Sequence, residues 1–154
     1  MLEILYSVFI AAAACYGFCI IFNIRDKNMW YSIIGAALGW LAYLLIERMN
    51  IGGVIPYFIS GVVVSLYSEI LARIRHQPST CFLIIGILPL VPGGGVYYTM
   101  KFWVQGNYIE FGERGMATLA SAGAIALGIM FIISIFRLFA AISARKHLKR
   151  IKSK

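Results

Sequence analysis

Hydrophobic positions form five long runs that are separated by short polar or charged turns. The runs cover about residues 2–22, 29–46, 54–72, 81–104 and 116–136. A run of roughly 20 apolar residues is long enough to cross the ~30 Å hydrocarbon core of a bilayer as a helix. The pattern therefore predicts an all-α, polytopic membrane helical bundle of about five transmembrane helices over residues 1–140, followed by a tail over residues 141–154.

The fourth run is interrupted by the segment Pro89–Gly95, which contains two prolines and three glycines. Proline removes a backbone donor and clashes with the preceding turn, and glycine frees the backbone. The halves on either side, residues 81–91 and 96–104, would measure about 16 Å and 13 Å as helices. Together they match one crossing, although a re-entrant segment that enters and leaves on the same side has compatible lengths.

Composition supports a membrane protein and argues against an enzyme. The chain has 154 residues, of which 61% are hydrophobic and 13% charged, and its mean hydropathy is +0.84. This is far outside soluble usage, and the length leaves no room for a separate catalytic domain. The sequence contains no Cys/His cluster with metal-ligand spacing, no paired carboxylates and no hydrolase or nucleotide motif. We therefore expect no enzymatic activity, no metal and no cofactor.

The distribution of charge predicts the topology. With five crossings, only Arg48, Lys101 and Arg114 of the 14 basic residues fall on the side opposite the basic tail. The positive-inside rule then predicts an outside N-terminus and a cytoplasmic C-terminus. Because the tail directly follows a membrane span, its expected partner is anionic lipid rather than nucleic acid. Each Lys or Arg near an anionic leaflet contributes about 1 kcal/mol to binding.

Small residues recur at four-residue spacing in three of the runs. They are Gly35 and Gly39, Gly61 and Ser65, and Ala120, Ala124 and Gly128. This spacing lets membrane helices approach closely. Packing within the chain explains most of these positions, but five short helices leave some small-residue faces for another polypeptide.

The break in the fourth run is the predicted substrate site. A second helical half that begins at Val96 would present unpaired amides and the positive end of its dipole, which favour a carboxylate. The predicted binding residues are Pro92, Gly93, Gly94, Gly95, Tyr97, Tyr98 and Thr99. The glycines would let a small solute reach the main chain, and the hydroxyls would lie in the first turn. The alternative is that proline and glycine only bend the helix.

Three further polar residues are candidates for a role in the membrane. Apart from Glu3 at the very start of the first run, Glu69 is the only acid inside a run, and an intramembrane carboxylate is typical of proton coupling, although Arg73 is near enough to pair with it at the interface. Ser65 lies on the same helical face as Glu69 and is a candidate cavity residue. Asn23 either caps the first helix or faces the cavity.

A set of residues spread over almost the whole chain resembles a known family. They are Gly17-Phe18, Phe22-Asn23, Gly35 to Gly39, Gly61, Pro78, and Pro89 to Gly93 followed by Tyr97 or Tyr98. With them the chain resembles the small membrane subunit of the threonine/serine exporter family, which includes the small partner of the two-component succinate exporter. The Pro-Gly run is the specific part of the resemblance.

The resemblance implies a function and a partner. The chain would be a subunit of a secondary exporter of threonine, serine or small dicarboxylates such as succinate, driven by protons. It would work with a larger membrane subunit in the bacterial inner membrane. The alternative is a non-transporting scaffold that assembles another membrane protein, and a homo-oligomer also remains open. No residue distinguishes the substrates from one another.

Overall fold

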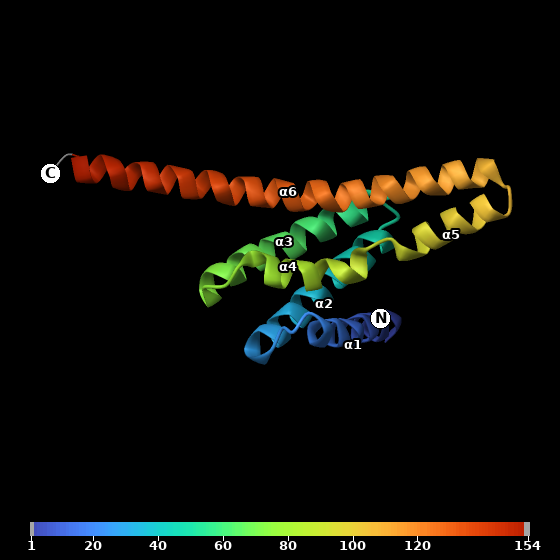
Figure 1. Cartoon of the computed structure of the whole chain (residues 1–154), viewed down its shortest axis with the longest axis horizontal. Helices are drawn as coiled ribbons and strands as arrows, with labels where there is room; N and C mark the ends of the chain where they lie inside the picture. The colour runs from blue at the N-terminus through green and yellow to red at the C-terminus, as the bar shows by residue number, and fades with distance from the viewer. Residues whose placement is uncertain (1, 153–154) are drawn as a thin grey trace.

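The computed structural model describes the backbone of residues 2–152 and side chains through residue 142. Its elements are α1 (Leu2–Ile21), α2 (Asp26–Arg48), α3 (Ile55–Arg75), α4 (Ser79–Ile87), the short 3-10 helix η1 (Leu88–Leu90), α5 (Gly93–Val104) and α6 (Tyr108–Lys152). Four helices are long and apolar enough to cross a membrane, and the bent pair Ser79–Leu90 and Gly93–Val104 raises the number to five if the pair forms one span. The predicted all-α membrane bundle is therefore confirmed (Figure 1).

The broken span bends but does not turn back. The axes of Ser79–Leu90 and Gly93–Val104 differ by 50°, so α5 continues in the same general direction as α4. In Figure 1 the two halves follow one another in the same general direction, and α5 packs on α6. This geometry favours one broken crossing over a re-entrant segment, whose second half would have to reverse direction.

The second half of the broken span begins earlier than the sequence predicted. It starts at Gly93 rather than Val96, directly after Pro92 with its φ of −75°. Proline fixes φ near helical values and needs no donor at a helix start, so it begins α5 at once. The three glycines take helical conformations, since Gly53 and Gly106 are the glycines with positive φ in the described chain.

The helices pack through the small residues that the sequence indicated. A Cβ atom at Gly61 would lie 2.8 Å from the carbonyl oxygen of Ile125, and one at Gly128 would collide with the carbonyl oxygen of Phe58. The backbones of α3 and α6 are therefore in direct contact. In the same way, Gly39 of α2 faces Val64 of α3. These small-residue faces therefore pack against other helices of the same chain.

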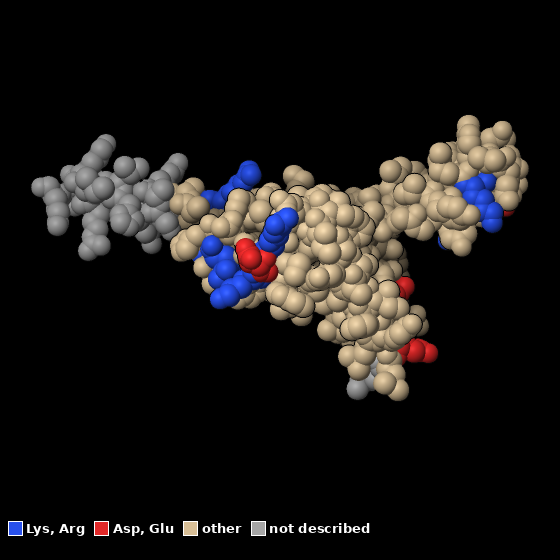
Figure 2. All heavy atoms as spheres, turned by 60° about the horizontal axis from the view of Figure 1, so that its bottom comes forward, with Lys and Arg blue, Asp and Glu red and all other residues tan. Residues whose placement is uncertain are grey.

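Helix α1 lies farthest from α6 and packs on α2 and the broken span (Figure 1). Its Cys15 and Cys19 are buried against Ile33, Ala36 and Ile85, so these two thiols act as small core residues. Figure 2 shows that charged side chains gather towards two ends of the molecule and leave an uncharged band between them. Such a band is what a bilayer core requires.

Helix α6 is 45 residues long. At 1.5 Å per residue it measures about 68 Å, more than the hydrocarbon core needs. The helix continues without a break past residue 140. The expected contact with anionic lipid depends on the side chains of residues 143–154, which lie outside the described residues.

The contact between α3 and α6 gives a stability prediction. Gly128→Ala should destabilise the protein by about 1–3 kcal/mol, because the new methyl group meets backbone atoms that cannot rotate away. Gly123→Ala is the matched control on the same helix. Its Cβ would have nothing within 4 Å, so this variant should be neutral or up to about 1 kcal/mol more stable. Thermal unfolding of both purified variants in detergent measures the difference, and equal stabilities would contradict the proposed contact.

Candidate functional site

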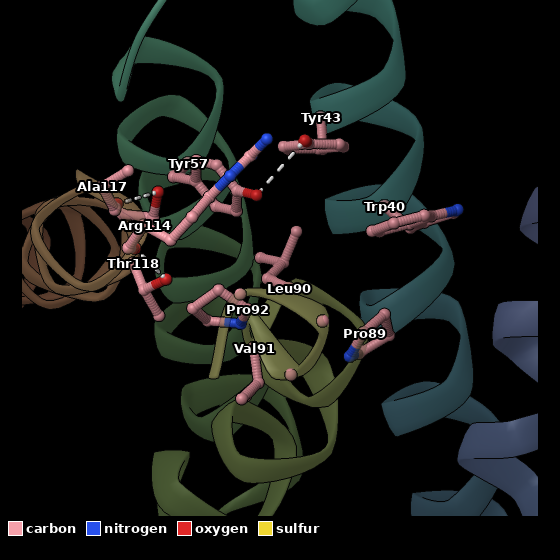
Figure 3. Close-up of a pocket in the computed structure, with 14 residues that line it drawn as sticks. Trp40, Tyr43, Tyr57, Pro89, Leu90, Val91, Pro92, Arg114, Ala117 and Thr118 are labelled. Atoms are coloured by element: carbon pink, nitrogen blue, oxygen red, sulfur yellow. Dashed lines mark hydrogen bonds between the residues drawn. The ribbon is translucent and has the colours of Figure 1, made fainter. Parts of the chain in front are cut away.

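A cavity of about 310 Å³ opens beside the break in the fourth span (Figure 3). Its walls come from α2, α3, the segment around the break and α6. The lining residues are Trp40, Tyr43, Tyr57, Pro89, Leu90, Val91, Pro92, Gly93, Gly94, Gly95, Arg114, Ala117, Thr118 and Ser121. Ligand sites measure about 300–1,000 Å³, so this one suits a small solute.

The start of α5 supplies unpaired backbone donors to this cavity. Gly93 donates its amide hydrogen to the carbonyl of Val91 at 2.7 Å, and Val96 donates to Pro92 at 3.1 Å. Within the described backbone, the amides of Gly94 and Gly95 have no carbonyl partner. Because both residues line the cavity, their N–H groups and the positive end of the helix dipole are available to an anion.

Arg114 brings a full positive charge to the same space. Its side chain extends from α6 across Tyr57 towards Tyr43 (Figure 3). Among the described residues that line the cavity, Arg114 alone is charged. The planar guanidinium presents paired N–H donors that match a carboxylate. The cavity lining therefore combines a guanidinium with the unpaired α5 amides, a set of donors that suits a small anion.

Three aromatic side chains form the wall on the α2 and α3 side. Trp40 stacks on Tyr43 with ring centroids 5.2 Å apart, and Tyr57 tilts against Tyr43 at 4.9 Å. The indole N–H of Trp40 donates a hydrogen bond of 2.9 Å to the hydroxyl of Ser7 in α1. Behind Trp40 and Pro89 lies a second cavity of about 260 Å³, mostly apolar, whose other lining residues come largely from α1.

The wall formed by α6 is polar. The hydroxyl of Thr118 donates to the carbonyl of Arg114 at 2.7 Å, and that of Ser121 donates to Ala117 at 2.9 Å. These hydroxyls have used their hydrogens within the helix, so each presents oxygen lone pairs. A Cβ atom at Gly95 would lie 2.5 Å from the hydroxyl oxygen of Thr118. Glycine at this position therefore allows α5 to approach α6.

The structure places only part of the predicted substrate site at the cavity. Pro92, Gly93, Gly94 and Gly95 line it. Tyr97, Tyr98 and Thr99 do not: the two tyrosines are 64% and 50% exposed on the outside of α5, and the Thr99 hydroxyl donates to the carbonyl of Gly95 at 2.7 Å. The early start of α5 at Gly93 moves these three side chains beyond the first turn.

The three other candidates from the sequence lie away from the cavity. Glu69 is paired with Arg73 at 3.8 Å near the end of α3. Ser65 is buried and donates to the carbonyl of Ile129, at 3.4 Å, in the contact with α6. Asn23 is exposed in the turn after α1, where its φ of 55° is the left-handed conformation that asparagine tolerates.

Sequence reasoning missed the residues that give the cavity its charge and its aromatic wall. Arg114 belongs to a polar stretch that precedes the last apolar run; the pattern predicts a turn there, whereas α6 already begins at Tyr108. Trp40 and Tyr43 are spaced i, i+3 and share one face of α2. That spacing was the available signal, but Tyr57 joins them only through the fold.

Cysteine labelling can test whether the cavity holds water. In a variant without Cys15, Cys19 and Cys81, Ser121→Cys should react with a polar maleimide at least about tenfold faster than Leu119→Cys, since a thiol in hydrocarbon does not ionise. Leu119 is a fair control because it lies two residues away on α6, is 69% exposed and does not line the cavity. Equal labelling rates in membranes would contradict an aqueous cavity at this place.

Comparisons with known proteins bear on the family of this chain. The family model for the threonine/serine exporter, ThrE, matches residues 7–135. An uncharacterized protein of Haemophilus influenzae is 28% identical over 137 residues, which cover 84% of this chain and 46% of the relative, so the chain spans about half the length of that protein. No solved structure matches significantly. Since the family model covers most of the chain, the protein belongs to the threonine/serine exporter family.

Proposed function

We propose that this chain is a subunit of a secondary active exporter of small amino acids, such as threonine and serine, or of small dicarboxylates, such as succinate. The observation that carries the proposal is that Arg114 and the unpaired amides of Gly94 and Gly95 belong to the lining of one cavity. All the named substrates carry a carboxylate. That group would lie between the guanidinium and the start of α5.

The break also offers a way to move the substrate. Helix α5 has no buried residue, and it packs mainly on α6. A tilt of α5 at Val91 and Pro92 would therefore open or close the cavity without exposing a core. Transporters with discontinuous helices use such movements around a site near the midplane.

The proposal includes a proton gradient as the driving force and a larger membrane subunit as the partner. Support for the partner comes from the relative that is about twice as long as this chain, and from the exposed apolar surface of α5. The charge distribution supports a location in the bacterial inner membrane with the C-terminus in the cytoplasm.

Efflux measurements test this function directly. Cells that express the chain alone, the larger family subunit alone, or both are loaded with labelled threonine, serine and succinate. We expect efflux of at least one of them only when both proteins are present. Efflux with this chain alone would instead support a self-sufficient homo-oligomer. No efflux above that of cells with neither protein, with both verified in the membrane, would contradict the exporter and favour the scaffold.

Arg114→Gln tests the site within that assay. Loss of a charged hydrogen-bond partner costs about 1.5–3 kcal/mol, so the substrate concentration for half-maximal efflux should rise about 10- to 150-fold. Arg114→Lys should recover only part of this, because an ammonium lacks the paired donors. Lys101→Gln is the matched control: Lys101 lies over the ring of Tyr98, at 5.9 Å, outside the cavity, and its loss should leave efflux unchanged. Equal effects of both Gln substitutions would mean that the charge acts only on topology.

A further inference from the structure

A groove runs along α1 on the far side of the wall that Trp40 and Pro89 form. It is the mostly apolar cavity of about 260 Å³ described above. Six residues of α1 line it, and they recur every three or four positions on one helical face. They are Ser7, Ile10, Ala11, Ala14, Cys15 and Phe18. From the first to the last they cover about 16 Å of the helix axis at 1.5 Å per residue, so the groove is long and narrow.

The groove opens on a surface that faces lipid. Ile10 is 50% exposed and Phe18 is 39% exposed although both line the groove, so they stand at its open side. The groove extends over the middle of α1, which is long and apolar enough to cross a membrane. In Figure 1 this helix lies at the edge of the bundle, farthest from α6. The medium outside the groove is therefore the hydrocarbon of the bilayer rather than water.

The polar side chains of the groove already have hydrogen-bond partners. Among the described lining residues they are those of Ser7, Cys15 and Trp40. The indole N–H of Trp40 donates to the hydroxyl of Ser7 at 2.9 Å, and the thiol of Cys15 donates to the carbonyl of Ile85 at 3.8 Å. A buried water needs about two to four polar partners, whereas an engineered apolar cavity of about 150 Å³ stays dry and binds benzene. The groove therefore favours an apolar occupant over water.

We propose that this groove binds one acyl chain of a membrane phospholipid. A volume of about 260 Å³ spread over the length of the groove is too narrow for a helix of another protein, whose diameter with side chains is about 10–12 Å. A lipid tail is thin and apolar, and it is already the solvent at this depth. An empty groove would leave its walls without contacts on one side, and a tail restores that dispersion energy.

The bound tail packs against the central cavity from outside. Trp40 and Pro89 line both the groove and the central cavity. A tail in the groove therefore supports two residues of the wall beside the break, and the shape of that wall depends on the surrounding lipid. The lipid site goes beyond the proposed export of a carboxylate, because no group in the groove has to contact a substrate.

Fluorescence quenching by brominated lipid tests the site. Trp30→Phe together with Trp103→Phe leaves Trp40 as the only tryptophan of the full chain. This parent protein is placed in phosphatidylcholine vesicles whose tails carry bromine near the middle, and in vesicles without bromine. Bromine quenches an indole only at contact range. Because the tails are in large excess and the site would be mostly occupied, we expect Trp40 to lose about half of its fluorescence or more.

Two substitutions fill the groove, and a neighbouring one does not. Ala14→Leu and Ala11→Leu, each in the parent protein, place a branched side chain where the tail would lie, so the quenching of Trp40 should largely disappear. Ala13→Leu is the matched control. Ala13 is on the same helix and exposed, but it does not line the groove, so this variant should be quenched as strongly as the parent.

Three results would overturn the lipid site. Thermal unfolding in detergent first verifies that the variants are folded, and either folded variant that fills the groove is sufficient. Quenching of that variant as strong as in the parent would overturn the proposal, and so would its loss in Ala13→Leu. No quenching of Trp40 in the parent would show that water or a protein side chain occupies the groove instead. Since the vesicles contain no substrate, each of these results leaves the proposed export function standing.

Discussion

Backbone groups that lose their helical partners inside a membrane must find others, and this constraint organises the structure around Pro92. The segment after α4 cannot continue as one helix, because proline at position 92 supplies no donor. Leu90 is buried against Val64 and Ile125, and this contact closes the break on one side. On the other side the free amides of Gly94 and Gly95 face the cavity. The backbone groups left unpaired by the break therefore face the cavity rather than the hydrocarbon.

The groups that line the cavity beside the break determine which solutes it favours. Two amides and one guanidinium provide positive potential, and no acid is found among the described residues that line the cavity. Such an arrangement favours a negative group. The ammonium of an amino acid would meet the faces of Trp40, Tyr43 and Tyr57, which attract cations through their π-electrons.

Much of the fold was predictable from the sequence because hydrocarbon imposes simple rules. Apolar runs of sufficient length specified the helices, and the glycines at 61 and 128 indicated close packing, although not which helices would meet. The break was also evident, but its internal geometry was not. Glycine is disfavoured in helices and common in loops, so nothing local showed that α5 begins at Gly93, and the positions of Tyr97 and Tyr98 depended on that start.

The charged and aromatic parts of the site were harder to predict, for a different reason. Arg114 lies in a polar stretch that local sequence cannot separate from a loop, and only the continuous helix α6 carries it to the cavity. Tyr57 reaches Tyr43 because α2 and α3 pack side by side. An aromatic residue in an apolar run has the same local signal whether it faces a core, lipid or a cavity.

The hydrogen bond between Trp40 and Ser7 holds part of the wall between two cavities. Trp40 borders the central cavity on one face and the apolar cavity beside α1 on the other. A single indole ring therefore forms part of the barrier between the polar cavity and a mostly apolar space, and its orientation is fixed by a hydroxyl on the outermost helix. Movement of α1 away from α2 would release that ring, so this part of the wall of the central cavity depends on a helix that contributes no residue to the cavity lining.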